Sequence, residues 1–289
     1  MHCPEPADGP GPRDLTRAAA LRLREAGVES ADHDAAELLA FALGTTRSRL
    51  PLVGHVDAAA ESAFDELVSR RAAREPLQHL TGTAAFRYVE LAVGPGVFVP
   101  RPETELLAGW AVERAQALPD TVVVDLCTGS GAIARSIAAE VPRARVHAVE
   151  LDEHALRWAA RNLSGTGVDL REGDMATAFP DLDGQVDVVV CNPPYIPHDA
   201  WESVAPEVRD HDPDAALYSS GDDGLDAMRV VEEVAGRLLK PGGWVGAEHA
   251  DAQGESAPQV FATTGRWLDV RDHLDLAGRP RYLTARRAG

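Results

Sequence analysis

The sequence VVVDLCTGSGA at residues 122–132 decides the fold class. Its first five residues form an apolar, β-prone run, which is typical of a strand buried on both faces of a sheet. Glycines at 129 and 131 follow, and residues 132–140 have the pattern of a helix. A glycine-rich turn between strand and helix lets a ligand approach the backbone and presents helix N-terminal amides to it. The stretch therefore predicts a nucleotide-type binding loop at the edge of an α/β sheet.

Strands and helices alternate on both sides of this loop. Short apolar runs bounded by turn residues predict strands, and longer runs with helical spacing predict helices. Such alternation is typical of a parallel, doubly wound α/β sheet. The predicted strands are Arg145–Glu150, Val168–Arg171, Val186–Cys191 and Trp244–Glu248, and the predicted helices are His154–Asn162 and Leu225–Leu239.

The chain before the sheet has a different pattern. Residues 13–75 are Ala-rich with apolar residues at helical spacing, which predicts a small helical bundle. A basic end at Arg70, Arg71 and Arg74 suits the C-terminal dipole of its third helix. Residues 76–96 contain two short alternating runs between glycines and predict a β-hairpin linker. We therefore expect a flexible tail at 1–12, the bundle at 13–75, the linker at 76–96 and the α/β domain at 97–289.

Composition limits the classes of function. The 289 residues carry a formal net charge of −18, whereas a nucleic-acid-binding protein needs a basic surface. No apolar run approaches the roughly 18 residues of a membrane span. Three scattered cysteines and ten histidines show neither a disulfide framework nor metal-ligand spacing. The start of the chain does not have the pattern of a signal peptide. We expect a cytoplasmic protein without a metal, a membrane or direct nucleic-acid contact.

Acidic residues follow the predicted strands at the positions where a nucleotide-like ligand would meet them. Glu150 ends the strand after the loop, where a carboxylate can accept hydrogen bonds from ribose hydroxyls. Asp174 follows the third strand and can contact an adenine edge. Gly129, Gly131 and Ala134 also satisfy the G-x-G-x-x-A pattern of NAD sites, and a turn that binds nothing is a further alternative. Asp125, before the glycines, argues against NAD; in a methyltransferase, an acid at this position can hold the glycine loop and lie near the positively charged methionine end of the cofactor.

The tetrapeptide Asn192-Pro193-Pro194-Tyr195 follows the predicted strand Val186–Cys191. Two prolines stiffen this turn and add no N–H donors. The Asn192 side-chain oxygen and the Pro193 carbonyl can then accept both hydrogens of a planar NH₂ group, and Tyr195 can stack over its plane. Hydrogen bonds that tighten as the nitrogen becomes pyramidal would favour its attack on a methyl group. A rigid turn with a core tyrosine is the alternative interpretation.

These motifs, with further runs, resemble one enzyme family. The loop 125–131 and Asn192–Tyr195 resemble the amino-methyltransferase branch of class I methyltransferases. The runs PLQHLTG at 76–82 and PGVFVPRPETE at 95–105 closely resemble the PrmC/HemK family, as do DGLD at 223–226, LKPGG at 239–243 and Glu248-His249. The resemblance covers almost the whole chain.

The resemblance implies a Rossmann-like class I methyltransferase domain with an N-terminal helical bundle and a β-hairpin. It implies transfer of a methyl group from S-adenosylmethionine to the glutamine of the GGQ motif of peptide chain release factors. We expect a monomer. We also expect the helical bundle to recognise the release factor, although the bundle could instead only cover a surface of the catalytic domain.

By the same resemblance, each part of the site has a role. Asn192, Pro193, Pro194 and Tyr195 are the expected catalytic residues, and Phe98 and Arg101 close the cleft near the substrate. The cofactor is expected to contact Asp125, Cys127, Thr128, Gly129, Ser130, Gly131, Glu150, Asp174, Met175 and Asn192. Three of these depart from the family pattern: Cys127 replaces a common glycine, Glu150 a common aspartate and Met175 a common aromatic residue.

Other functions stay open at this point. The Asn192–Tyr195 motif also suits a methyltransferase of a nucleobase amine, or of glutamine in another protein. An NAD-dependent oxidoreductase is a further alternative, but the chain downstream of the loop shows no recognisable Tyr/Lys or His/acid catalytic pair. A cofactor-binding module without catalysis would predict damage to the cleft, yet Asn192 and both prolines are present.

Overall fold

The structure is a computed structural model that describes residues 10–289. Most of the predicted tail therefore lies outside the described residues, and the first helix begins at Pro12. Contacts divide the chain into two compact units. One holds the chain up to Gly82 together with Pro206–His211, and the other holds Thr83–Ala205 and Asp212–Gly289. The segment Pro206–His211 thus packs with a part of the chain that is far from it in sequence.

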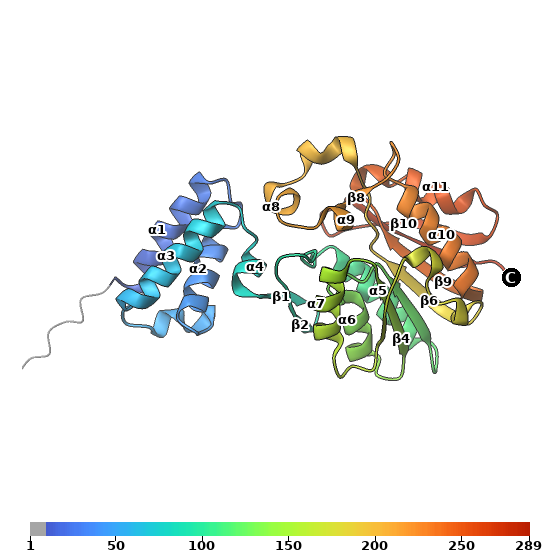
Figure 1. The fold of residues 1–289 in the computed structure, drawn as a ribbon, viewed down its shortest axis with the longest axis horizontal. Helices are drawn as coiled ribbons and strands as arrows, with labels where there is room; N and C mark the ends of the chain where they lie inside the picture. Colours follow the sequence, from blue (N-terminus) through green and yellow to red (C-terminus); the bar gives the residue numbers. More distant parts are fainter. Residues whose placement is uncertain (1–9) are drawn as a thin grey trace, which may run out of the picture. The chain divides into compact units, whose positions relative to one another are not determined.

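The first unit is a helical bundle, as the sequence predicts (Figure 1). Its buried side chains include Leu23, Leu38, Leu39 and Phe64, which come from three successive helices at helical spacing. The unit consists of α1 (Pro12–Glu25), α2 (Ala31–Ala42), the 3₁₀ helix η1 (Arg47–Leu52), α3 (Ala58–Ala72), α4 (Leu77–Thr81) and the short α8 (Pro206–Arg209).

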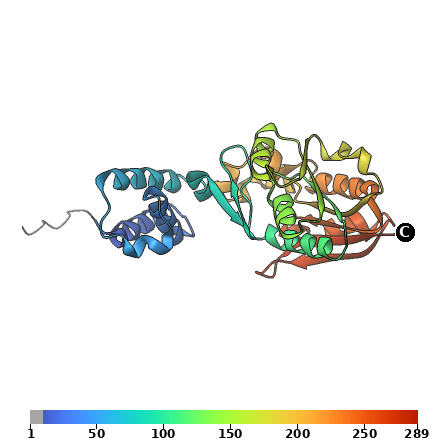
Figure 2. The same cartoon turned by 90° about the horizontal axis from the view of Figure 1, so that it is seen from below.

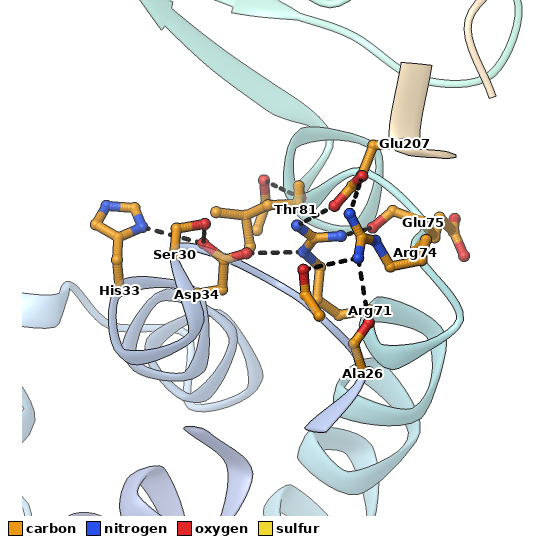
Figure 3. Close-up of polar contacts among 11 residues, drawn as sticks. Ala26, Ser30, His33, Asp34, Arg71, Arg74, Glu75, Thr81 and Glu207 are labelled. Atoms are coloured by element: carbon orange, nitrogen blue, oxygen red, sulfur yellow. Dashed lines mark hydrogen bonds and ion pairs between the residues drawn. The ribbon is translucent and has the colours of Figure 1, made fainter. Parts of the chain in front are cut away.

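Charged side chains fasten α8 to this bundle (Figure 3). Arg71 donates from Nε to Asp34 Oδ2 at 2.7 Å, and both side chains are almost fully buried. Glu207 of α8 accepts from Arg74 at 2.5 Å and from Arg71 at 3.1 Å. Beyond the predicted interaction with the helix dipole, Arg71 and Arg74 therefore have specific carboxylate partners.

The second unit begins with a hairpin and continues as an α/β sheet (Figures 1 and 2). The hairpin pairs β1 (Thr83–Phe86) with β2 (Val89–Ala92). The main sheet has the order β10-β11-β9-β6-β3-β4-β5, in which β11 runs antiparallel to both of its neighbours. Its strands are β3 (Val122–Leu126), β4 (Arg145–Glu150), β5 (Asp169–Glu172), β6 (Val186–Cys191), β9 (Leu239–Glu248), β10 (Trp267–Leu274) and β11 (Pro280–Arg287).

Helices cover both faces of the sheet, which confirms the predicted Rossmann-like fold. One core lies between the sheet and α5 (Thr104–Gln116), α6 (Ala132–Glu140) and α7 (Glu153–Leu163). The other lies against α10 (Asp226–Leu238) and α11 (Ser256–Ala262). Alternate residues of β3 point to opposite cores, with Val123 in the first and Val122 and Val124 in the second.

Short elements lie in the connections between the main strands and helices. They are η2 (Met175–Thr177), η3 (Pro180–Leu182), β7 (Ile196–Pro197), η4 (His198–Ser203), α9 (Asp214–Leu217), β8 (Tyr218–Ser219) and η5 (Asp251–Gln253). Within residues 10–289, no helix combines the length and apolar character that crossing a bilayer requires.

Candidate active site

Strand register brings the two sequence motifs together. β3 and β6 are parallel neighbours, and Leu126 pairs with Cys191 as the last residue of each strand. The glycine loop and the turn Asn192–Tyr195 therefore leave the same edge of the sheet from adjacent strands. This edge, at the carboxyl ends of parallel strands, is where open α/β folds bind ligands.

The glycine loop has three residues in the left-handed region, Cys127, Gly129 and Gly131, with φ of 56°, 57° and 83°. Gly131 has the φ that favours glycine, and a Cβ there would also lie only 3.0 Å from Leu163 Cγ, a tight contact. Cys127 adopts this conformation with a side chain, at a cost of roughly 1–2 kcal/mol. A glycine at this position would adopt the same conformation without that cost.

Asp125, near the end of β3, fixes the glycine loop through two hydrogen bonds. Its Oδ2 accepts from the Thr128 hydroxyl at 2.6 Å and from the Ala134 amide at 3.1 Å. Its buried Oδ1 has no hydrogen-bond partner among the residues that the structure describes. Burial raises the pKa of Asp125 to about 7, although the bonds from Thr128 and Ala134 oppose this shift. An unsatisfied buried carboxylate oxygen beside a ligand loop suits a cationic ligand group.

Glu150 is fixed at the end of β4 by three backbone amides. Oε2 accepts from the Gly129 amide at 2.7 Å, and Oε1 accepts from Leu151 and Asp152 at 2.9 Å. Burial raises the pKa of Glu150, and these bonds oppose the shift. A carboxylate has about four acceptor sites, so capacity remains for ligand hydroxyls. The glutamate side chain, which is longer than that of aspartate, thus reaches the Gly129 amide of the glycine loop.

A hollow of about 190 Å³ lies beside Asp174 and is lined by residues 171–174, 177–180 and Val149. The exposed Asp174 caps η2 by accepting from the Ala176 amide at 2.8 Å. The Cys127 thiol donates to Met175 Sδ at 3.4 Å, so the glycine loop contacts η2 through two polarizable sulfurs.

Asn192 and Tyr195 are held by polar partners from other elements. Asn192 Nδ2 donates to Thr104 Oγ1 at 3.4 Å, and the Tyr195 hydroxyl donates to Glu248 Oε1 at 3.2 Å. Gln253 donates to the Tyr195 carbonyl at 3.2 Å. A Cβ on Gly224 would lie 2.6 Å from that same carbonyl, so only glycine allows this close approach.

Phe98 and Arg101 contact each other. The Arg101 guanidinium lies over the Phe98 ring, 4.8 Å from its centre, and donates to Asp212 Oδ2 at 2.5 Å. Burial raises the pKa of Asp212 to about 6, although the charge of Arg101 opposes this shift. This arrangement of cation, ring and carboxylate holds both predicted substrate residues in place.

The arrangement of the glycine loop and the turn Asn192–Tyr195 agrees with the relatives that the chain resembles in sequence. Over 93% of its length it is 59% identical to a release factor glutamine methyltransferase of Streptomyces coelicolor, of which it covers 96%. This protein belongs to the release factor glutamine methyltransferase family. Residues 14–82 match the PrmC N-terminal domain, and residues 123–211 match a methyltransferase domain. The predicted family resemblance is thereby confirmed.

The chain is also similar to a methyltransferase with a different name and to a methyltransferase of known structure. A 4-amino-L-phenylalanine/4-methylamino-L-phenylalanine methyltransferase of Streptomyces pristinaespiralis is 46% identical over 71% of each chain. The crystal structure of a methyltransferase from Pyrococcus furiosus is 19% identical, with a TM-score of 0.53 over 76% of this chain and 100% of that one. The second likeness concerns the fold alone.

Sequence reasoning gave no role to three buried residues of this family member: Thr104, Asp212 and Glu248. Thr104 lies in the run 95–105, and Glu248 is in the pair Glu248-His249, so both are in segments that carry the resemblance. Their polar character within these segments was the signal from which a role for Thr104 and Glu248 could have been predicted. Asp212 lies in none of these segments, and no pattern in the sequence marks it.

Proposed function

We propose that this protein transfers a methyl group from S-adenosylmethionine to the side-chain amide nitrogen of the glutamine in the GGQ motif of peptide chain release factors, giving N5-methylglutamine. One observation carries the proposal. The turn Asn192–Tyr195, suited to a planar NH₂ group, and the glycine loop leave adjacent strands at one sheet edge, in a chain of this family.

The described residues fit S-adenosylmethionine. Asp125, with its unpaired buried oxygen, suits the positive charge of the methionine end. That end would be lined by Cys127, Thr128, Gly129, Ser130 and Gly131. Glu150 would accept hydrogen bonds from the ribose hydroxyls. Asp174, which lines the hollow described above, and Met175 would flank the adenine. When bound, the cofactor would supply a methyl carbon on positively charged sulfur, and Asn192 would border it.

The turn Asn192–Tyr195 prepares the amide nitrogen. Asn192 Oδ1 and the Pro193 carbonyl each accept one amide hydrogen, while Pro194 keeps the turn rigid and Tyr195 covers the amide plane. These bonds would tighten as the nitrogen becomes pyramidal and forms its bond to the methyl carbon, while the carbon–sulfur bond breaks and its electron pair goes to the sulfur. They would therefore favour the transition state over the flat amide. The surplus proton then leaves to water, and no strong base is needed.

Further parts of the proposal concern recognition. Phe98 and Arg101 border the glutamine, and the helical bundle binds another surface of the release factor. The net charge of −18 supports a protein substrate without direct nucleic-acid contact. We propose a monomer that acts in the cytoplasm and does not bind membranes.

A second candidate function has one observation in its favour. The Streptomyces pristinaespiralis relative has a name that describes methylation of an aryl amine, which is also a planar NH₂ group. The same two acceptors at Asn192 and Pro193 would hold such an amine. The two functions differ in whether the substrate is a folded protein or a small molecule.

The test is the intact mass of a purified release factor after incubation with this protein and S-adenosylmethionine. We expect a single methyl addition, located by fragmentation to the GGQ glutamine. A release factor with GGA in place of GGQ is the control and should gain nothing. A parallel reaction contains 4-amino-L-phenylalanine instead of release factor. Methylation of the small amine, with none of the release factor, would overturn the proposed function in favour of the second candidate.

A further inference from the structure

Helix α7 supports the segment 92–96, which leads from the hairpin to the proposed substrate residues. Three side chains, spaced four residues apart on one face of this helix, contact the segment. They are His154, Trp158 and Asn162. Trp158 Nε1 donates to the Pro95 carbonyl at 3.3 Å, and a Cβ on Gly96 would lie 2.9 Å from His154 Cβ. The segment therefore follows α7 from its last turn toward its first.

Asn162 starts this contact and also reaches the glycine loop. Its Oδ1 accepts from the Ala92 amide at 2.8 Å, and its Nδ2 donates to the Ala92 carbonyl at 2.9 Å. The same Nδ2 donates to the Ser130 carbonyl, also at 2.9 Å. Asn162 is 6% exposed and Ser130 is 3% exposed. One buried amide thus joins the segment 92–96 to the loop that is proposed to bind the cofactor.

The three partners of this amide specify asparagine. One partner, the Ala92 amide, needs an acceptor, and the carbonyls of Ala92 and Ser130 each need a donor. A primary amide has one acceptor oxygen and two N–H donors, so its orientation is fixed, whereas a carboxylate has no donor at all. An aliphatic side chain of similar volume would leave all three groups unpaired, at a cost of about 1–3 kcal/mol each. Hydrogen bonding, more than volume, therefore accounts for Asn162.

The end of α7 supports the glycine loop at a second point. Leu163 packs behind Gly131, where a Cβ would lie 3.0 Å from Leu163 Cγ. Arg135 of α6, the helix that follows the loop, donates to the Asn162 carbonyl. The position of the loop and the position of the segment 92–96 are therefore both set by the last turn of α7.

We propose that Asn162 is a positioning residue for methyl transfer, because its amide holds the cofactor loop and the substrate segment in one fixed relation. The inference rests on the proposed function, in which the loop borders the methyl donor and Phe98 and Arg101 border the glutamine. Transfer requires the methyl carbon and the amide nitrogen to be in line, and a misplacement of about 1 Å can lower the rate about 100-fold. Two segments bonded to the same side chain keep that alignment.

The first experiment compares Asn162→Ala with Arg157→Gln. Arg157 is an exposed residue of α7 that pairs with Glu153, so its substitution is the matched control. At saturating S-adenosylmethionine and release factor, well below the melting temperature, we expect kcat of Asn162→Ala to fall by roughly 10- to 100-fold. Cofactor binding should weaken by roughly 3- to 10-fold, since the Ser130 carbonyl loses a hydrogen bond. Arg157→Gln should match wild type in both quantities.

A second variant, Gly96→Ala, tests the substrate segment without touching Ser130. Gly96 has a φ of 88°, and a Cβ there would meet His154, so the substitution should displace the segment from α7. We expect kcat/KM for release factor to fall by roughly tenfold, while the affinity for S-adenosylmethionine stays near that of wild type. Asn162→Ala should lower both, because Asn162 contacts both segments.

Hydrogen exchange provides a readout that a merely structural role would not change, and it needs no turnover. In wild type, S-adenosylmethionine should slow amide exchange in the loop 127–131 and also in residues 92–97, because Asn162 connects the two. In Asn162→Ala, the cofactor should still slow exchange in the loop but no longer in residues 92–97. Arg157→Gln should show the wild-type pattern.

The outcomes are distinguishable. Cofactor-dependent protection of residues 92–97 that persists in Asn162→Ala would overturn the inference, as would a wild-type kcat. A lower melting temperature with both of these properties unchanged would also overturn it, because Asn162 would then be structural. Should Asn162→Ala not fold, an unchanged kcat/KM in Gly96→Ala overturns it instead. If wild type does not methylate release factor, the proposed function fails, while the spread of protection still decides the inference.

Discussion

Arg71 of α3 and Asp34 of α2 form an ion pair with a distance of 2.7 Å, in which both side chains are almost completely buried. Removing one partner of such a pair leaves an uncompensated charge inside the protein. We expect Asp34→Ala to lower the free energy of unfolding of the bundle by about 3 kcal/mol. Urea denaturation, followed by hydrogen exchange in α1–α3, measures this loss. Asp14→Ala, which removes an exposed pair with Arg17, is the matched control and should be near neutral.

Glu207 fastens α8 to the bundle through Arg71 and Arg74, as Figure 3 shows. Burial raises the pKa of Glu207, but hydrogen bonds from Arg74 and Arg71 outweigh it, and the net pKa is lowered. We expect Glu207→Gln to speed amide exchange in residues 206–211. In wild type, protection there should be complete near pH 7 and fall as the pH drops below the ordinary glutamate range.

Asp210→Asn is the control for this experiment, since Asp210 lies in the same segment but is exposed and pairs with its neighbour Arg209. Equal exchange in Glu207→Gln and Asp210→Asn would show that the ion pairs do not hold α8.

The sequence allowed the α/β part of the fold to be predicted because its strands are buried on both faces. β3 and β6 are almost continuous apolar runs, and these two strands and β4 have the predicted bounds. The strands β10 and β11 were not predicted. β10 is largely exposed and rich in charges, as edge strands often are, so its pattern resembles a loop.

The polar part of the site was harder to predict than its motifs. The turn Asn192–Tyr195 and the loop 125–131 are contiguous, so each motif can be recognised alone. Thr104, Asn192 and Glu248 are far apart in the sequence and meet only through the register of β6 and β9 and the packing of α5. For the same reason, no local pattern predicts that Glu207 belongs with Arg71.

Buried acids give the protein a pH dependence of stability, and Asp125 contributes to it. Its pKa is raised to about 7, mainly by burial, so between pH 4 and 7 the folded state holds a proton that the unfolded state has released. The free energy of unfolding should therefore decrease as the pH rises through this window. We expect Asp125→Asn to show a smaller decrease in melting temperature from pH 5 to pH 8 than wild type. A slope equal to that of wild type would mean that Asp125 is ionised in the folded protein without ligand.

Cofactor binding should show the opposite dependence on pH. A positively charged ligand prefers the ionised form of Asp125, so binding should release protons below about pH 7 and tighten as the pH rises. Isothermal titration calorimetry of S-adenosylmethionine in buffers of different ionisation enthalpy measures the number of protons released. We expect this number to fall toward zero in Asp125→Asn. Proton release unchanged by the substitution would assign the linkage to another group, such as Glu150.

Substitutions of Asn192 and Asp125 should separate methyl transfer from cofactor binding. Asn192→Ala removes the oxygen proposed to bind the glutamine amide, so we expect methyl transfer to be lost while cofactor affinity stays largely intact. Asp125→Ala removes the carboxylate that holds Thr128 and the loop, so we expect cofactor affinity to fall first. Each variant is the control for the other, with affinity measured by calorimetry and transfer by intact mass of the release factor. Loss of both properties in Asn192→Ala would contradict its role in holding substrate, and normal cofactor affinity in Asp125→Ala would refute the placement of the methionine end beside it.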